Sequence, residues 1–278
     1  KFRDTIELMD YICSLIEKSD KMCLATTTAE VRESYNSGKI AFILGFQDGS
    51  VIEENLSYLR TFYRLGVRCL QPAYTGGNLI GDGCGERRNG GLTFWGIEVI
   101  EEANRLNMLI DLSHCSDQTT MDVIRISKSP PVFTHANVRS LCDTARNKSD
   151  EAIKAVADRG GFIGVTPLPT FVSREKPNLD ILIDHIDYLV NLAGIDHVGI
   201  GTDFTEGLKD KGQIFEAAKT WRKRRPDIFG TVDDFYNKPY AEGIEDISKL
   251  PNLTEGLVRR GYSDDHIEKI LGLNFMRV

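Results

Sequence analysis

The stretch that decides the fold is Met108-Leu109-Ile110-Asp111-Leu112-Ser113-His114, followed along the chain by Pro131-Val132-Phe133-Thr134-His135. Both runs are short and mostly apolar, both end on a histidine, and one helix-like segment separates them. A short apolar run bounded by turn residues predicts a strand that is buried on both faces. Each histidine then stands where a parallel strand gives way to its loop, which is the catalytic face of a (β/α) barrel.

The two histidines admit two interpretations. The chain has only five histidines, and a lone one is most simply a half-buried imidazole with satisfied hydrogen bonds. A pair at equivalent points of consecutive βα units favours metal binding, because imidazole is the commonest metal ligand and neighbouring strand ends converge in a barrel. We therefore interpret His114 and His135 as candidate metal ligands.

Around these two runs the sequence alternates between strand and helix patterns. Strands are expected over 40–46, 67–72, 108–112, 132–134, 162–166 and 197–201, with a shorter extended segment at 22–26. Helices are expected over 5–18, 28–37, 52–65, 94–106, 118–127, 150–159, 179–193, 254–260 and 263–271. Regular alternation predicts an α/β fold whose parallel sheet is covered on both faces. We expect a TIM-type (β/α)8 barrel. Since such a barrel needs eight strands, one or two would precede Lys1.

The domain organisation follows from length and from one long polar stretch. A chain of 278 residues with 41% hydrophobic content can bury one large core, so a single catalytic domain over 1–278 is expected. Residues 205–248 break the alternation and predict a lid-like insertion, because long loops after barrel strands commonly cover the site. Trp221, Tyr236 and Tyr240 would either cover a substrate there or pack the lid on the barrel.

Composition excludes several classes of protein. A net charge of −7 and a pI near 5.4 argue against a nucleic-acid surface, which needs clustered cationic charge. The six cysteines show no CxxC pairing, which suits a reducing compartment. No apolar stretch is long enough for a membrane span, and the first residues lack the apolar core of a signal peptide. We expect a soluble, cytoplasmic protein.

Further polar residues stand at the carboxyl ends of the expected strands and in the loops that follow. Asp203 closes the last strand, where it is either a turn residue or a group that takes a proton from a metal-bound water or binds the metal directly. Arg146 follows the His135 strand. Two interpretations remain equally open for it: a surface ion pair, or a pair of hydrogen bonds to a substrate carboxylate. Gln47 and Tyr74 end two earlier strands.

An ordered set of motifs resembles the membrane (renal) dipeptidase family of zinc peptidases, in a divergent bacterial-type branch. This resemblance implies that the barrel is amidohydrolase-like. These motifs are Gly38-Lys39-Ile40-Ala41 through Gly45, Leu59-Arg60 through Arg68, Gly91-Leu92-Thr93, Leu109 through His114, Thr134-His135-Ala136-Asn137, Ala145-Arg146-Asn147, Val198 through Phe204, Gly261-Tyr262-Ser263, and Leu273 through Val278. They cover nearly the whole chain.

The resemblance implies roles for individual residues. His114 and His135 would bind zinc in a binuclear centre, Arg146 with its neighbour Asn147 would contact the substrate carboxylate, and Asp203 would handle protons at the water. The implied activity is hydrolysis of dipeptides, or of similar small amides that carry a free carboxylate.

Three departures from the family pattern bear on that activity. No His-x-Asp pair precedes Phe46, and Gln47 stands where the family has a metal-bridging glutamate. A neutral amide is a weak donor between two dications, so the residues support one zinc better than two. Tyr74 replaces a histidine near the substrate, and its hydroxyl can still donate a hydrogen bond to a tetrahedral intermediate.

The sequence therefore leaves three functions open. The first is a zinc-dependent, dipeptidase-like metallohydrolase with a small dipeptide-like substrate. The second is a catalytically degenerate relative that binds a peptide-like ligand without hydrolysing it. The third is a single-metal barrel lyase, because the fold alone does not set the chemistry. No nucleic-acid partner and no membrane span are expected, and a homodimer is one assembly left open.

Overall fold

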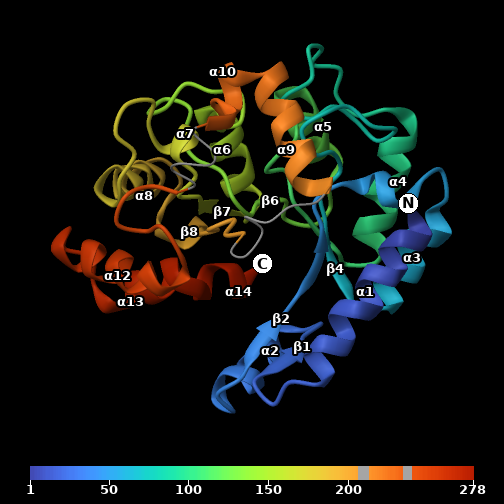
Figure 1. Ribbon diagram of the computed structural model, residues 1–278, viewed down its shortest axis with the longest axis horizontal. Coiled ribbons are helices and arrows are strands. Elements are labelled where there is room, and N and C mark those ends of the chain that lie inside the picture. Colours follow the sequence, from blue (N-terminus) through green and yellow to red (C-terminus); the bar gives the residue numbers. More distant parts are fainter. Residues whose placement is uncertain (206–212, 234–239) are drawn as a thin grey trace. The chain divides into compact units, whose positions relative to one another are not determined.

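The structure is a computed structural model that describes residues 1–205, 213–233 and 240–278 (Figure 1). The chain falls into two compact units, residues 1–131 and residues 132–278. Each unit contains a three-stranded parallel sheet together with helices. No helix in the described ranges has the length and apolar character needed to cross a bilayer.

The first unit alternates helices with strands, as the sequence predicts. Its helices are α1 (Phe2–Glu17), α2 (Thr28–Asn36), α3 (Leu56–Arg64), α4 (Phe94–Arg105) and α5 (Asp117–Ile126), with a 3-10 turn at Gly49–Ile52. Its strands are β1 (Met22–Leu24), β2 (Ile40–Phe42), β3 (Leu44–Phe46), β4 (Val67–Leu70) and β5 (Leu109–Ile110). Strands β3, β4 and β5 are neighbours in that order, and β1 pairs with β2 in a separate sheet.

The single strand expected over 40–46 is two strands in different sheets. The chain pairs with β1 as far as Phe42 and with β4 from Leu44 onward, and its register against β4 shifts between Leu44 and Gly45. Such an irregularity bends a strand and redirects its side chains. Burial on both faces is also wrong for this segment, because Ile40 is 62% exposed and Phe42 is 37% exposed.

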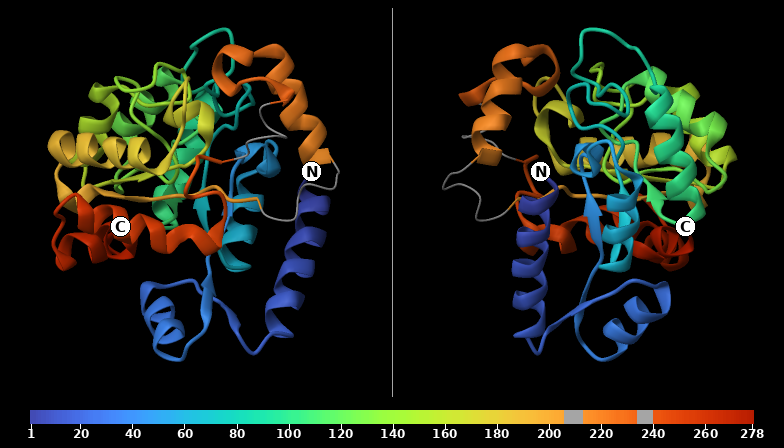
Figure 2. Two further views of the ribbon diagram at one scale, coloured as in Figure 1. Left: turned by 60° about the vertical axis from the view of Figure 1, so that its left-hand side comes forward. Right: turned by 90° about the vertical axis from the view of Figure 1, so that its right-hand side faces the viewer.

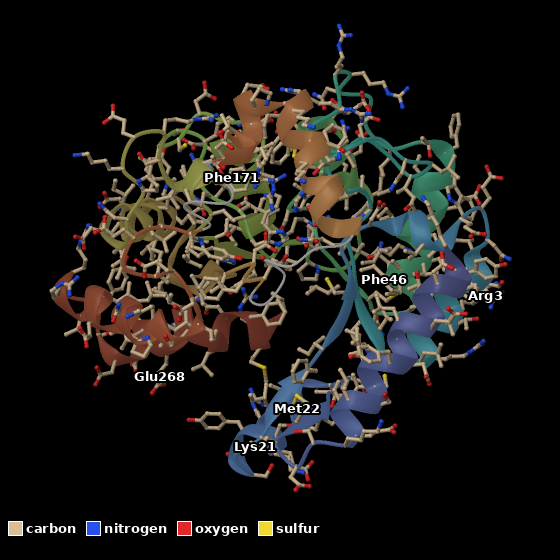
Figure 3. All side chains as sticks on the ribbon, in the orientation of Figure 1. Arg3, Lys21, Met22, Phe46, Phe171 and Glu268 are labelled. Carbon is tan, nitrogen blue, oxygen red and sulfur yellow. The ribbon has the colours of Figure 1, made fainter. Side chains whose placement is uncertain are left out.

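Aromatic contacts attach α1 to α3 within the first unit. The ring of Phe2 stacks on Tyr58 with centroids 3.9 Å apart and packs against Phe62 at 5.0 Å. Phe46, labelled in Figure 3, extends this cluster, with its ring edge-on to Phe62 and the centroids 4.6 Å apart. Figure 2 shows that α2, β1 and β2 lie together at one end of this unit. The cluster therefore fixes the strand that leads into Gln47.

The second unit continues the parallel alternation. Its strands are β6 (Val132–Phe133), β7 (Phe162–Val165) and β8 (Val198–Ile200), which are neighbours in that order. Its helices are α6 (Asp150–Asp158), α7 (Pro169–Val172), α8 (Leu179–Ala193), α9 (Gln213–Arg224), α10 (Pro226–Phe229), α12 (Leu250–Arg259), α13 (Asp264–Glu268) and α14 (Asn274–Arg277), with short turns at Ile195–His197 and Ile247–Lys249. A π-helical turn, Lys269–Leu273, joins α13 to α14 and interrupts the helix expected over 263–271.

Glycines bring the strand ends of this sheet very close together. A Cβ atom on Gly201 would lie 1.7 Å from the carbonyl oxygen of Thr134, and one on Gly164 would lie 2.3 Å from the same atom. Only residues without a Cβ can occupy both positions. The two glycines therefore press the ends of β7 and β8 against the residue that precedes His135.

The stretch 205–248 is only partly described. Residues 206–212 and 234–239, which include Tyr236, lie outside the described residues. Trp221 lies in α9, and Tyr240 is 8% exposed. The lid-like insertion and the single domain remain predictions.

Candidate functional site

His114 is held in place by the turn that follows β5. The side chain of Asp111 accepts a hydrogen bond from the backbone N–H of Ser113 at 3.0 Å, and Ser116 caps α5 by accepting from Thr119 N–H at 3.2 Å. These are typical ways for short polar side chains to close a turn and to begin a helix. His114 is 4% exposed, so its imidazole is almost withdrawn from bulk water.

Tyr74 is brought onto His114. Their ring centroids lie 4.2 Å apart with 26° between the planes, and the tyrosine is 36% exposed. The backbone at Gly83 passes close to the backbone of Tyr74, and only glycine fits there, because a Cβ would lie 1.8 Å from the carbonyl oxygen of Tyr74. The next residue, Cys84, donates its backbone N–H to the carbonyl of His114 at 2.7 Å. The glycine-rich loop thus supports both aromatic rings.

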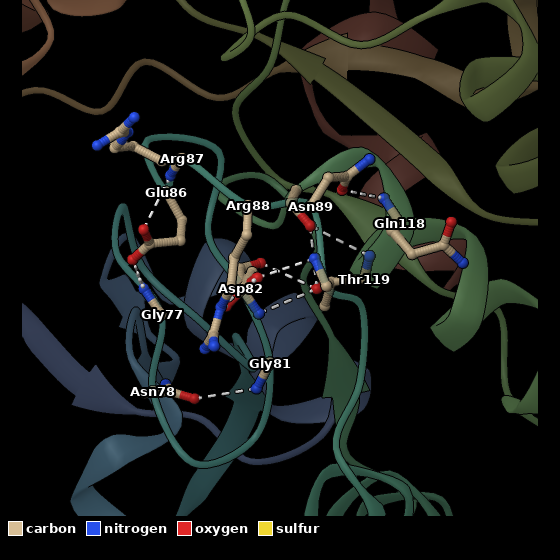
Figure 4. Close-up of polar contacts among 12 residues, drawn as sticks. Gly77, Asn78, Gly81, Asp82, Glu86, Arg87, Arg88, Asn89, Gln118 and Thr119 are labelled. Carbon is tan, nitrogen blue, oxygen red and sulfur yellow. Dashed lines mark hydrogen bonds and ion pairs between the residues drawn. The ribbon is translucent and has the colours of Figure 1, made fainter.

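The same loop, residues 76–91, is fastened to the start of α5 (Figure 4). Thr119 accepts a hydrogen bond from Asp82 N–H at 3.1 Å and donates its hydroxyl to the carbonyl of Asp82 at 2.9 Å. The buried carboxylate of Asp82 accepts from Gly90 N–H at 2.8 Å and pairs with the exposed Arg88 at 3.1 Å. These hydrogen bonds and the ion pair fix the shape of the loop beside the start of α5.

Gln47 and Asp48 follow β3 and have different surroundings. Gln47 is exposed, and its carbonyl accepts a hydrogen bond from the side chain of the buried Gln71. Asp48 accepts from Ser50 N–H at 2.9 Å and from the side chain of Asn78 at 2.8 Å. The Asp48 carboxylate is therefore engaged in capping a turn. Gln47 remains the candidate metal ligand at this strand end.

His135 begins the loop after β6. A hydrogen bond of 2.7 Å joins its Nδ1 to the hydroxyl of Thr134, and the residue is 7% exposed. Ala136 N–H donates to the carbonyl of Gly164 at 2.7 Å, which ties the start of the loop to β7. The bond at Nδ1 fixes the ring orientation, as the partners of metal-binding histidines commonly do.

The structure brings Arg146 to His135. The guanidinium donates to the carbonyl of His135 at 2.7 Å and lies over the ring of Phe171, labelled in Figure 3, at 5.4 Å. Its exposed fraction is 0%. A surface ion pair is thus wrong for this residue, while a grip on a substrate carboxylate remains a prediction.

Asn147 is occupied by the protein itself. Its side-chain nitrogen donates to the carbonyls of Cys142 at 2.8 Å and Phe171 at 2.9 Å, and it is fully buried. The carbonyl of Asn147 also accepts from Arg139 at 2.8 Å. These bonds shape the loop that carries Arg146, while substrate contact by Asn147 stays a prediction.

Asp203 follows β8 in an uncommon backbone conformation, with φ of 52°. Its carbonyl accepts a hydrogen bond from the hydroxyl of Tyr240 at 2.9 Å. Thr166, at the end of β7, donates its hydroxyl to the carbonyl of Thr202 at 3.4 Å. The turn around Asp203 is therefore supported from two sides.

Two residues that sequence reasoning missed shape the loop after His135. Asn137 joins β6 to β7, accepting from Thr166 N–H at 2.8 Å and donating to its carbonyl at 2.9 Å. His185 accepts from Val138 N–H at 3.1 Å and bonds the carbonyl of Val172 at 3.0 Å. A histidine on the buried face of a helix was a signal in the sequence, because a buried polar group needs partners.

The cysteines near the strand ends are poor nucleophiles. Burial raises the pKa of Cys69 well above its usual range, and the nearby charge of Asp111 raises it further. Burial also raises the pKa of Cys142. Because the thiolate is the reactive form, neither side chain favours covalent catalysis.

The donor set determines which metal the residues could hold. His114 and His135 supply imidazole nitrogens, which suit zinc, and Gln47 would add a weak amide oxygen. Within 1–205, 213–233 and 240–278, no three His, Cys, Asp or Glu side chains gather into a metal-binding group. The two imidazoles are suitable ligands for a divalent metal. Two such ligands are fewer than the three protein ligands usual in a catalytic zinc site.

Curated relatives of the chain are dipeptidases. Dipeptidase verJ of Clonostachys rogersoniana is 33% identical over 279 residues, covering 99% of this chain and 64% of that protein. An uncharacterized dipeptidase of Schizosaccharomyces pombe is 30% identical over 289 residues, covering 99% of this chain and 62% of its own length. The chain thus spans less than two thirds of the length of these relatives.

Solved structures and a family model give the same assignment. An amidohydrolase from Pseudomonas aeruginosa is 34% identical with a TM-score of 0.88, covering 99% of this chain and 83% of that one. A metallo peptidase from Rhodobacter sphaeroides, liganded with a phosphinate mimic of L-Ala-D-Ala, is 25% identical with a TM-score of 0.77, covering 92% and 68%. The predicted α/β fold, an amidohydrolase-like TIM-type barrel, is confirmed. Because the membrane dipeptidase model of peptidase family M19 matches residues 1–223 and 227–278, the chain belongs to this metallopeptidase family.

Proposed function

We propose that this protein is a zinc-dependent hydrolase of dipeptides, or of similar small amides with a free carboxylate. The observation that carries the proposal is the placement of His114 and His135, each buried at the carboxyl end of a parallel strand. Two such imidazoles would hold one zinc ion. When bound, the metal would polarise the scissile carbonyl and lower the pKa of a water molecule enough for attack near neutral pH.

The remaining residues would bind the substrate and move protons. Arg146 would hold the carboxylate, because a guanidinium matches its geometry with two parallel hydrogen bonds. Asp203 would accept a proton from the attacking water and pass it to the amine as the C–N bond breaks, which leaves a carboxylate and a free amine. Tyr74 would donate a hydrogen bond to the oxyanion that develops on the carbonyl.

The experiment compares metal content and turnover in the full chain. We expect the purified protein to bind zinc, to hydrolyse a dipeptide such as L-Ala-D-Ala or L-Ala-L-Ala, and to lose that activity on chelation. His114→Ala and His135→Ala should each lose both metal and turnover. His197→Ala is the matched control. This histidine lies just before the amino end of β8, where its imidazole bonds the carbonyl of Gly161, and not at the carboxyl end of a strand.

The second candidate is a ligand-binding protein without turnover. Gln47 favours it, because a neutral amide replaces the carboxylate that would help to hold a metal. Binding of a dipeptide without hydrolysis, in a protein that takes up no zinc, would support this candidate and overturn the first.

A further inference from the structure

The backbone at Asp203 is in the left-handed region. Its φ of 52° is one of three positive values at non-glycine residues in the described ranges, the others being at Glu53 and Asn107. This conformation is uncommon for a residue with a Cβ, although aspartate adopts it more readily than most residues do. Contacts from the rest of the fold would stabilise the turn that carries Asp203.

The hydroxyl of Tyr240 bridges that turn. It donates to the carbonyl of Asp203 at 2.9 Å and accepts from the backbone N–H of Thr205 at 2.8 Å. The hydroxyl of Thr205 lies 3.2 Å away, and the tyrosine ring packs edge-on against Phe204 with centroids 4.7 Å apart. One side chain thus contacts each of the three residues 203, 204 and 205.

Tyr240 is itself fixed by its neighbours. Ala241 donates its N–H to the carbonyl of Pro167 at 2.8 Å, and Glu242 donates to the carbonyl of Pro177 at 3.1 Å. Leu179 N–H returns a bond of 2.8 Å to Glu242. The segment is therefore anchored to the loop after β7, and Tyr240 transmits that rigidity to Asp203.

We propose that Tyr240 is a positioning residue that holds Asp203 in the backbone conformation needed for proton transfer. This inference rests on the proposed function, in which Asp203 receives a proton and returns it. A proton donor and its acceptor must stay within hydrogen-bond reach for efficient transfer. Tyr240 does this through the backbone of the turn, whereas the sequence suggested only a cover for the substrate or a packing contact.

The test is Tyr240→Phe in the full chain, which keeps the ring and removes the hydrogen bonds of the hydroxyl to Asp203 and Thr205. We expect kcat for dipeptide hydrolysis to fall roughly 10- to 100-fold, with KM and zinc content near the wild-type values. Hydrogen exchange at the Thr205 amide should become faster. Tyr262→Phe is the matched control, because it removes a hydroxyl bond of 2.6 Å to Asp187 on α8 and should leave kcat unchanged.

The outcomes separate this inference from the proposed function. If the wild type hydrolyses dipeptides and Tyr240→Phe matches its kcat, the inference is overturned while the proposed function stands. A rise in KM alone would also overturn it, since the tyrosine would then act on substrate binding. If the wild type has no activity, the proposed function fails and the inference fails with it. Circular dichroism and the melting temperature establish that both variants are folded.

Discussion

The ring of Tyr74 stacks on the imidazole of His114, with centroids 4.2 Å apart, although the two residues belong to different strand ends. The tyrosine follows β4 and the histidine follows β5, which are adjacent strands of one sheet. The stack restrains the plane of the imidazole, and the orientation of a ligand ring affects metal affinity. Under the proposed function, Tyr74 would therefore make two separable contributions, one through its ring and one through its hydroxyl.

Variants of Tyr74 should separate these contributions. Tyr74→Phe keeps the stack, so we expect unchanged zinc affinity and a fall in kcat on the order of 100-fold, from loss of one donor to the oxyanion. Tyr74→Leu removes the stack as well and should weaken zinc binding by roughly 10-fold. Metal titration and steady-state kinetics measure the two effects. Equal zinc affinity in the two variants would contradict a role for the ring.

Arg146→Lys tests recognition of the substrate carboxylate. Lysine keeps the charge but loses the planar fork, so kcat/KM for a dipeptide should fall roughly 10- to 100-fold, mainly through KM. The control is a dipeptide amide, which has no terminal carboxylate and should be hydrolysed equally by both proteins. Because Arg146 also bonds the carbonyl of His135, an equal loss on both substrates would point to a purely structural role.

Gln47→Glu tests the weak donor at the end of β3. A carboxylate adds a negative charge and a stronger oxygen ligand, so we expect tighter zinc binding or a second bound metal. Zinc content per chain, measured by elemental analysis after equilibrium dialysis, gives the result. Asp48→Asn is the control, because Asp48 caps the following turn and an asparagine can still do so. A zinc content equal to that of the wild type would exclude Gln47 from the metal site.

The buried histidine on α8 predicts a pH dependence of stability. Burial lowers the pKa of His185, while its bond to Val172 and the charge of Asp184 oppose that shift. Below about pH 6.5 this histidine is protonated in the unfolded chain but stays neutral in the folded chain. The free energy of unfolding therefore falls as the pH drops toward the folded pKa, by at most about 1.4 kcal/mol per pH unit.

Urea unfolding at pH 7.5 and pH 5.5 measures this effect. His185→Asn should reduce the loss of stability between the two pH values, because asparagine does not titrate and its oxygen can still accept from Val138 N–H. An identical pH dependence in the variant and the wild type would show that His185 makes no contribution.

Local pattern was a good guide wherever one element decides its own conformation. The strands that precede His114 and His135 were predicted within two residues at each end, because a short apolar run between turn residues has few alternatives. The prediction of one strand over 40–46 was wrong. The segment pairs first with β1 and then with β4, and this change of partner depends on strands outside the segment.

The sequence by itself determined the alternation of strands and helices, the two histidines at strand ends and the resemblance that named the family. These depend on periodicity and residue type within one segment. Only the tertiary structure decided that Arg146 is buried against His135, that His185 holds Val138 and that Tyr240 reaches back 37 residues to Asp203. Buried hydrogen bonds of this kind join segments far apart in the chain, and their geometry exists only once the strands and loops have packed together.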